Sequence, residues 1–319
     1  MASDYTERVT TRTEDGVELS AGVVRPTGEP RAVVLAGHAM MVDARTLDRP
    51  LGRGMASVLA ERGFLVVAAD FRGHGRSGTP VSRGGQWTYD DLVLRDFPAL
   101  LELARSQAPG KECVVLGHSL MGHVGAAYLG LHPDTPVRAL IAISSNLWLR
   151  NRESELYRRA RKAVDITTIE LLTRLFGHFP ARRLRMGSMD ESGGYMRQLC
   201  DTYHRSRWRS TDGTLDYHAG LANIRVPTLA VIGKGETYWC TEESVHAFFA
   251  PVPAELFTCW RVGAGHLGLT RDPGHIDIVT DPRSAPLWHA LADWILELEH
   301  EHRLSAVRSS SRTRCGSRD

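Results

Sequence analysis

Short apolar runs rich in valine recur along this chain and alternate with stretches of helical periodicity. Each run is too short to form a helix, and glycine or charged residues bound it. Uninterrupted apolar runs of this kind are typical of strands buried on both faces, as in a parallel sheet. Their alternation with helices predicts a doubly wound α/β fold. The runs are residues 32–36, 64–69, 113–116, 137–143, 228–232 and 256–262, and the helical stretches are 52–62, 90–107, 124–131 and 285–301.

The strand pattern stops between residues 145 and 222, where the chain is arginine-rich and helical. We therefore expect an α/β core of residues 1–144 and 223–302 with an inserted helical cap of residues 145–222. The arginines of this insertion have aspartate and glutamate neighbours, which indicates a solvated surface and not an anion site. Residues 303–319 are rich in serine and arginine without apolar periodicity, which predicts a disordered tail.

Composition excludes several classes of partner. Of the 319 residues, 42% are apolar, and the formal net charge of +2 argues against bulk affinity for nucleic acid or anionic membranes. No apolar run approaches the roughly 20 residues of a membrane span. Residues 1–12 lack the apolar core of a signal peptide. We expect a cytoplasmic protein with no nucleic-acid partner and no stable membrane insertion; the sequence does not indicate its oligomeric state.

The five cysteines are odd in number and scattered, and no C-x-x-C pair occurs among them. This pattern predicts reduced thiols and indicates neither a disulfide framework nor a zinc site. We expect no metal and no organic cofactor.

The strongest chemical signal is the run from Val114 to Gly122, in which a buried strand enters a sharp turn and a helix leaves it. A serine on such a turn projects its hydroxyl above the sheet, and the N–H of the next residue faces the reacting carbonyl. The helix N-terminus adds a field that favours an oxyanion. Ser119 is therefore the predicted nucleophile, and Leu120 supplies one oxyanion donor. We call residues 117–122 the nucleophile elbow.

One residue of the elbow departs from the usual form. Glycine commonly lies two residues after the serine, whereas Met121 occupies that place and Gly122 follows it. The Met121 side chain needs space against a neighbouring strand, and we expect Ala36, Ala68 and Ala69 to provide it.

A serine hydroxyl needs a base to remove its proton, and histidine is the usual one. Where a serine lies on a strand-to-helix turn, an acid and then a histidine follow it in the chain. His266 lies in the glycine-rich loop directly after the last predicted strand, so we expect it to be the base. His118 and His123 lie on the elbow and its helix, where they are expected to pack. His74 is expected to be structural. His38 is expected to order the loop after residues 32–36, which we call the oxyanion loop.

The histidine needs an acid to fix its tautomer. Glu236 is the carboxylate in the loop after residues 228–232 and is the predicted third member. The second oxyanion donor is expected in the loop after residues 32–36, where the backbone N–H of Ala39 or of Met40 would supply it.

Several runs together resemble the α/β-hydrolase superfamily, and most closely bacterial hydrolases of the serine aminopeptidase and monoglyceride lipase-like group. The resemblance covers residues 15–144 and 223–301 and implies the same nucleophile, base and acid, Ser119, His266 and Glu236. Aspartate is commoner than glutamate as the acid, and the oxyanion loop lacks the usual glycine-rich or aromatic form. The runs are Leu35-Ala36-Gly37-His38, Asp70 to Gly78, Gly117-His118-Ser119-Leu120, Pro227 to Gly233 and Gly265-His266.

These residues predict a serine hydrolase that cleaves a carboxylic ester of a small-molecule acyl substrate through an acyl-enzyme intermediate. Amide, peptide or thioester hydrolysis and acyl transfer use the same triad and stay open as alternatives. A non-catalytic ligand-binding or interaction protein on the same fold is the alternative from another class, because Met121 crowds the elbow.

Overall fold

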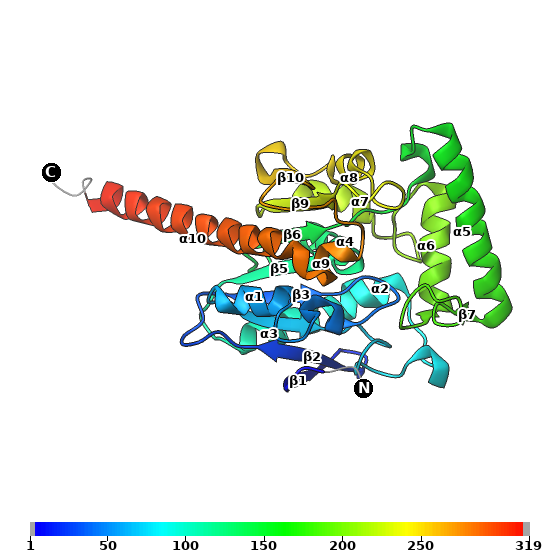
Figure 1. Ribbon diagram of the computed structural model, residues 1–319, viewed down its shortest axis with the longest axis horizontal. Coiled ribbons are helices and arrows are strands. Elements are labelled where there is room, and N and C mark those ends of the chain that lie inside the picture. The colour runs from blue at the N-terminus through cyan, green and yellow to red at the C-terminus, as the bar shows by residue number, and fades with distance from the viewer. Residues whose placement is uncertain (1–3, 315–319) are drawn as a thin grey trace.

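The computed structural model describes residues 4–314. An eight-stranded sheet of order β1-β2-β4-β3-β5-β6-β9-β10 runs through its centre (Figure 1). Its strands are β1 (Glu7–Arg12), β2 (Glu18–Val24), β3 (Val33–Gly37), β4 (Leu65–Ala69), β5 (Cys113–His118), β6 (Ala139–Ile143), β9 (Thr228–Gly233) and β10 (Phe257–Val262).

The sheet is mostly parallel. β2 pairs antiparallel with β1 and with β4, and every other pair of neighbours is parallel. The β1–β2 hairpin turns at Asp15-Gly16, where Gly16 has a φ of 82° that suits glycine. Every residue of β3, β4, β5, β6 and β9 is buried, as valine-rich runs without polar alternation predict. The predicted doubly wound α/β fold is confirmed.

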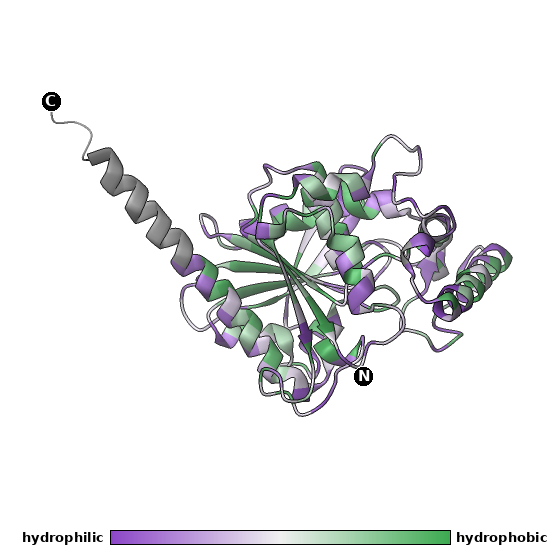
Figure 2. Cartoon of the chain, turned by 90° about the horizontal axis from the view of Figure 1, so that it is seen from above, coloured by the Kyte–Doolittle hydropathy of each residue, from purple (hydrophilic) through white to green (hydrophobic). Residues whose placement is uncertain are grey.

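Helices cover both faces of the sheet, and each face has its own apolar cluster. Side chains of α3, α4 and α8 pack on one face, and side chains of α1, α9 and α10 pack on the other. Figure 2 shows the apolar strands between these layers. The helices are α1 (Met55–Glu61), α2 (Tyr89–Asp91), α3 (Phe97–Ser106), α4 (Leu120–Leu131), α5 (Leu156–Phe176), α6 (Gly193–Arg205), α7 (Tyr217–Gly220), α8 (Glu242–Phe249), α9 (Asp277–Thr280) and α10 (Ala285–Arg314).

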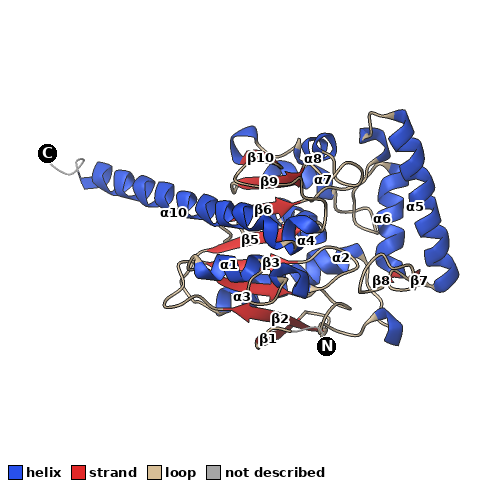
Figure 3. Cartoon of the chain, viewed as in Figure 1, coloured by secondary structure: helices blue, strands red, loops and turns tan. Residues whose placement is uncertain are grey.

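The segment between β6 and β9 adds no strand to the eight-stranded sheet in the part of the chain that the structure describes. It holds α5, α6 and α7, together with the strands β7 (His178–Phe179) and β8 (Glu191–Ser192), which pair only with each other (Figure 3). Helices were expected here, but the two-residue strands were not. We keep the name cap for residues 145–222.

Two predicted elements differ in detail from the structure. The predicted helix 90–107 is present, but α2 and α3 are joined by a π-helical turn at Leu92–Asp96, just before Pro98. Helix α10 continues to Arg314, where the sequence predicted disorder from residue 303, and residues 315–319 lie outside the described residues. None of the described helices combines the length and apolar character that a membrane crossing requires.

The parallel strands end at the same edge of the sheet, and the loops after β3, β5 and β9 meet there. Helices α5 and α6 lie beyond this edge, while the far end of α10 points away from the opposite edge (Figure 1). In open α/β sheets, ligands bind at the carboxyl ends of the strands. The fold therefore places the candidate site between this edge and the cap.

Candidate active site

The nucleophile elbow connects β5 to α4, with Ser119 at its apex. Ser119 has φ 51°, a strained value for a residue with a side chain, and its N–H donates to the carbonyl of Ile143 at 2.8 Å. The turn is tight enough to exclude side chains on both sides: a Cβ at Gly117 would lie 2.2 Å from the nitrogen of Gly122, and one at Gly122 would lie 2.0 Å from Ser145 Oγ. These two glycines let the turn close.

Met121 of this elbow packs against β3. Its side chain is fully buried, and a Cβ at Gly37 of β3 would lie 2.3 Å from Met121 Cγ. The space for the methionine is thus provided by the missing side chain of Gly37. The sequence predicted Ala36, Ala68 and Ala69 for this role; the elbow instead contacts the last residue of β3, which is Gly37.

Glu236 lies in the loop after β9. Its Oε1 accepts hydrogen bonds from the backbone N–H groups of Tyr238 at 3.2 Å and Trp239 at 3.0 Å. Burial raises the pKa of this carboxyl, but the contact with His275 and backbone hydrogen bonds outweigh it and leave the pKa below its ordinary value. Glu236 is therefore an ionised acceptor at neutral pH.

His275, and not His266, lies against this carboxylate. Its Nδ1 is 2.8 Å from Glu236 Oε2, within hydrogen-bonding distance. The backbone of the segment is fixed at two points, because His118 Nε2 donates to the His275 carbonyl at 2.8 Å and Gly235 N–H donates to the Pro273 carbonyl at 3.1 Å. His275 shares a cavity wall with Ser119.

Two glycines near Glu236 bring this histidine close. We call residues 233–238, the last residue of β9 and the turn after it, the acid loop. A Cβ at Gly233 would lie 2.0 Å from the carbonyl oxygen of Pro273, and one at Gly235 would lie 2.7 Å from that of Asp272. Side chains at these two positions would push the segment of residues 272–275 away from Glu236. The glycines of the acid loop thus position a residue that follows them by some forty places in the chain.

The structure does not bring His266 to the site. It is exposed, and no hydrogen bond joins its ring to Ser119 or Glu236 within residues 4–314. The carboxylate of Asp272 accepts a hydrogen bond from Ala264 N–H at 2.8 Å and closes the intervening residues into a separate loop. We call residues 264–271 the side loop. Because it returns to its starting point, the histidine directly after β10 lies outside the cavity and the later one lies inside it.

A signal for His275 exists in the sequence. The pair Gly-His occurs twice after β10, at residues 265–266 and at residues 274–275. The second pair directly precedes the last helices of the chain, α9 and α10, whereas the first is separated from them by the side loop. Choosing the candidate base by its closeness to the last helices would have given His275. Choosing it by closeness to the last strand gave His266.

The predicted oxyanion residues lie at the cavity. Ala39 and Met40, which follow β3, line it, and Leu120 is the first residue of α4. The first N–H groups of a helix have no intrahelical acceptor. Met121 N–H donates to His38 O at 3.3 Å, whereas no backbone acceptor for Leu120 N–H occurs among the described residues outside regular helix bonding. His38 Nδ1 lies 2.7 Å from Ala39 O, the contact expected of a histidine that orders this loop.

A carboxylate of the cap, which the sequence analysis missed, also holds this loop. Glu191 of β8 is fully buried, and its Oε1 accepts the N–H of Met41 at 2.5 Å and lies 3.1 Å from His74 Nε2. Burial lowers the pKa of His74, but the charge and hydrogen bond of Glu191, together with the Arg72 carbonyl and the charge of Asp70, outweigh burial and the net pKa is raised. Met41 has φ 63°, and its carbonyl accepts the N–H of Met189 at 2.9 Å. Two cap residues thus fix a strained residue of the oxyanion loop.

A cavity of about 240 Å³ lies beside Ser119 and His275. Core and cap both contribute to its wall, and most of the side chains that face it are apolar. The apolar residues are Met40, Met41, Leu147, Ile169, Met186, Leu199 and Ile276, with Trp148 and Trp239 beside them.

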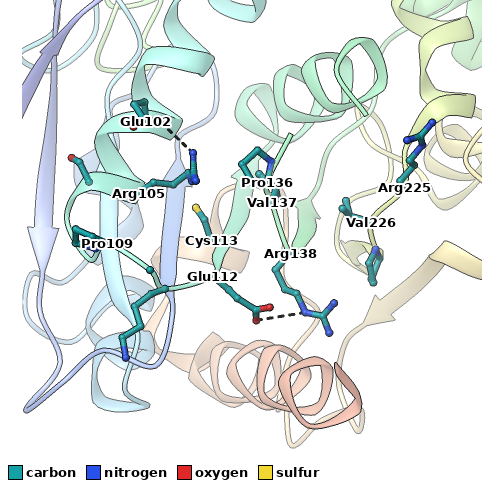
Figure 4. A pocket seen from close by; sticks show the side chains of 14 residues that line it. Glu102, Arg105, Pro109, Glu112, Cys113, Pro136, Val137, Arg138, Arg225 and Val226 are labelled. Atoms are coloured by element: carbon teal, nitrogen blue, oxygen red, sulfur yellow. Dashed lines mark hydrogen bonds and ion pairs between the residues drawn. The ribbon is translucent and has the colours of Figure 1, made fainter. Parts of the chain in front are cut away.

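A larger cavity, of about 710 Å³, lies at the other edge of the sheet, where β5 and β9 begin (Figure 4). Its charged groups are paired: Arg105 lies 3.2 Å from Glu102 and Arg138 lies 3.7 Å from Glu112. Lys111 and Arg225 pair with Glu29 and Asp134, which lie outside the cavity lining. Six residues of β5, a length of roughly 20 Å, separate this cavity from Ser119. It holds none of the residues of the elbow, the acid loop or the His275 segment.

Other reactive groups lie apart from the site. Residues 4–314 contain no cluster of histidine, cysteine, aspartate and glutamate with the geometry of a metal site. The four cysteines within this range are free, and burial raises the pKa of Cys113 to about 12.

Comparison with known proteins identifies the family of this chain. A family model described as serine aminopeptidase, S33, matches residues 28–266. A monoacylglycerol lipase of Mycolicibacterium smegmatis is 33% identical over 120 residues, and triacylglycerol lipase 2 of Arabidopsis thaliana is 32% identical over 130 residues. These matches span 37% and 36% of this chain but only 39% and 31% of the two lipases.

A solved esterase of Exiguobacterium antarcticum superposes with a TM-score of 0.60 at 16% identity, over 90% of this chain and 98% of the esterase. At this identity the likeness shows the fold alone, which is that of an α/β-hydrolase. The family model, in contrast, covers well over half of the sequence. The chain therefore belongs to the serine aminopeptidase (S33) family of α/β-hydrolases.

Proposed function

We propose that this protein hydrolyses carboxylic esters through an acyl-enzyme, with Ser119 as nucleophile, His275 as base and Glu236 as the acid that orients it. The observation that carries the proposal is the 2.8 Å approach of His275 Nδ1 to Glu236 Oε2 on the wall of the cavity that Ser119 lines. A base held by a carboxylate beside a serine on a strained turn is the arrangement that activates a hydroxyl.

In the first half of the reaction, His275 Nε2 accepts the proton of the Ser119 hydroxyl as its oxygen attacks the ester carbonyl carbon. Glu236 keeps the other proton of the imidazole on Nδ1 and stabilises the imidazolium that forms. The tetrahedral intermediate collapses when His275 returns the proton to the departing alcohol. Water, activated by the same histidine, then attacks the acyl-enzyme and releases the acid.

The negative charge of the tetrahedral intermediate needs preorganised donors. We assign this role to the N–H groups of Leu120 and of Ala39 or Met40. The Leu120 N–H lies at the N-terminus of α4, where the helix dipole favours an anion. The hydrogen bonds from Met41 N–H to Glu191 and from Met189 N–H to the Met41 carbonyl hold the loop that carries Ala39 and Met40 in place.

The substrate class follows from the wall of the cavity. Its apolar side chains from core and cap suit an apolar acyl chain that leaves water when it binds. The partially matching relatives are a monoacylglycerol lipase and a triacylglycerol lipase, which favours an oxygen ester as the scissile bond. We propose carboxylic esters with a flexible acyl chain as substrates, and residues 145–222 as the cap that selects among them. The cytoplasmic location stays a prediction from the sequence.

A fluorophosphonate probe and a panel of 4-nitrophenyl esters test the proposal. The wild-type protein is expected to be labelled at Ser119 and to hydrolyse the esters. Ser119→Ala is expected to lose both labelling and turnover, with a loss on the order of 10⁴-fold or more. Unchanged turnover in a folded Ser119→Ala would contradict the mechanism. Faster cleavage of aminoacyl anilides or thioesters would assign the triad to amide or thioester hydrolysis, and an unlabelled wild type would indicate a non-catalytic protein.

A further inference from the structure

Besides His275, a second imidazole interrupts the apolar wall of the cavity beside Ser119. His123 lines this cavity from α4, one helical turn after the nucleophile, and its side chain is 3% exposed. Asn146, another polar residue of the wall, already donates to the Trp239 carbonyl and to Ser244 Oγ. His123 is therefore the polar side chain to examine for a contact with the substrate.

Tyr89 holds this imidazole from behind. The Tyr89 hydroxyl lies 3.0 Å from His123 Nδ1, and the two rings stack with centroids 5.5 Å apart. Tyr89 is itself buried in an aromatic cluster with Tyr195, Trp208 and Tyr217. Such packing leaves the His123 ring little freedom to turn.

The partners of His123 determine which nitrogen carries its proton. Burial lowers the pKa of His123 to about 3, so the ring is neutral and has a single N–H. The Tyr89 hydroxyl has no other acceptor among the described residues, so it donates to Nδ1. Nδ1 is then the acceptor, and the proton of the imidazole lies on Nε2.

Nε2 makes no hydrogen bond to any residue that the structure describes, and it is not among the fully buried orphan atoms. Its accessible surface opens on the cavity that His123 lines. A donor in an apolar cavity is unfavourable until an acceptor enters. A plain alkyl chain would cover this N–H without pairing it, whereas an oxygen on the chain would pair with it.

We propose that His123 is a specificity-determining residue whose Nε2–H binds an acceptor oxygen on the acyl chain, so that the substrates are esters of oxygen-substituted acids. This inference rests on the proposed function, because it places the acyl chain in the cavity beside Ser119. One helical turn, roughly 5 Å along α4, separates the two residues, so we place the oxygen a few carbons along the acyl chain from the carbonyl carbon under attack. Esters with a keto group near the middle of a short chain fit this distance.

The test compares 4-nitrophenyl hexanoate with its 4-oxo and 5-oxo analogues, each rate being divided by that of hydroxide alone. We expect kcat/KM of the wild type to be about tenfold or more higher for one of the oxo esters than for hexanoate. The hexanoate chain leaves the buried N–H donor unpaired, and a penalty of this order is typical of an unpaired buried donor. His123→Phe is expected to bring this ratio close to one. His123→Gln, which keeps an N–H donor, is expected to restore part of it.

Two tyrosines of the aromatic cluster provide a matched pair of controls. Tyr89→Phe removes the hydroxyl that fixes the tautomer and is expected to reduce the ratio. Tyr195→Phe removes a hydroxyl that has no hydrogen-bond partner among the described residues, and is expected to leave the ratio unchanged. Equal losses of the ratio in both variants would mean that packing, and not the Tyr89 contact, is responsible, and would overturn the assignment.

A binding measurement separates this inference from the proposed function. Calorimetry with Ser119→Ala, alone and combined with His123→Phe, compares the affinities of methyl hexanoate and the two methyl oxohexanoates without turnover. An oxo preference that is lost with His123→Phe supports the inference. Equal affinities, or a preference that survives His123→Phe, overturn it. If the wild type hydrolyses no ester, the proposed function fails, and these affinities still decide the role of His123.

Discussion

The turn that carries Ser119 and the loop that carries His275 meet at one cavity but are built by different interactions. The turn is formed by neighbours in sequence: β5 enters it, α4 leaves it, and Gly117 and Gly122 let it close. The loop depends on distant residues, because Gly233 and Gly235 of the acid loop make room for it and His118 fixes its carbonyl. Local sequence therefore points to the proposed nucleophile, whereas the proposed base depends on which parts of the chain meet in space.

The two candidate histidines test this difference most directly. His275→Ala is expected to lower kcat on the order of 10⁴-fold or more, because it removes the proposed base, which Glu236 orients. His266→Ala, the matched control from the exposed side loop, is expected to keep turnover within about twofold, as surface substitutions do. Turnover of a 4-nitrophenyl ester by the two folded variants measures both. The opposite ranking would place the base in the side loop and break the comparison.

Glu236→Gln tests whether the loop of His275 depends on the charge of Glu236. The amide keeps an oxygen that can accept from Tyr238 and Trp239 but loses the charge that faces His275. We expect a loss on the order of 10²- to 10⁴-fold in kcat, smaller than for His275→Ala, because the acid orients the base and does not itself take the proton. Steady-state kinetics of the folded variant check this, and an unchanged kcat would exclude Glu236 from the triad.

Glu191→Ala tests whether the cap positions the oxyanion loop. Loss of the acceptor for Met41 N–H frees the loop, and a displacement near 1 Å is expected to lower kcat by about tenfold to a hundredfold. Glu191→Gln keeps an acceptor for Met41 and is expected to recover part of the loss, which a merely structural role would not predict. An equal loss in both variants, or a change in KM without one in kcat, would contradict this role.

Met121→Gly is expected to change turnover least. The side chain fills the space above Gly37, so its removal leaves a cavity and is expected to lower stability by about 2–5 kcal/mol. The helix also loses a better former at its second residue. Thermal unfolding and kcat per folded molecule provide the measurement. A tenfold gain in activity without a lower Tm would show that methionine had displaced the elbow.

Much of the fold could be predicted from sequence because its strands are short and apolar. The predicted strands match the structure to within two residues at most ends, since burial on both faces leaves little choice of residue type. The proposed nucleophile, Ser119, and the proposed acid, Glu236, could be selected because each follows such a strand. His266 was selected by the same rule, which fails where Asp272 closes the side loop on Ala264 N–H.

Long-range contacts account for what the sequence did not reveal. Nothing near Glu191 in the chain indicates that it accepts the N–H of Met41 and contacts His74, because the three residues come from separate segments. The two-residue strands β7 and β8 are too short to leave a periodic pattern. Likewise, the partner of Met121 is Gly37, whose contribution is the absence of a side chain.

The insertion of the cap between neighbouring strands has a consequence for synthesis on the ribosome. β6 and β9 are hydrogen-bonded neighbours, yet residues 144–227 separate them. At a translation rate of roughly 5–20 residues per second, synthesis of this segment takes about 4–17 s, and β6 lacks its neighbour β9 during that time. All of β6 is apolar and buried in the finished protein. A nascent sheet would therefore expose an unpaired apolar strand edge, which can associate with other chains, throughout that interval. Arrival of β9 pairs this edge and brings Glu236 into place, and the segment of His275 follows some forty residues later.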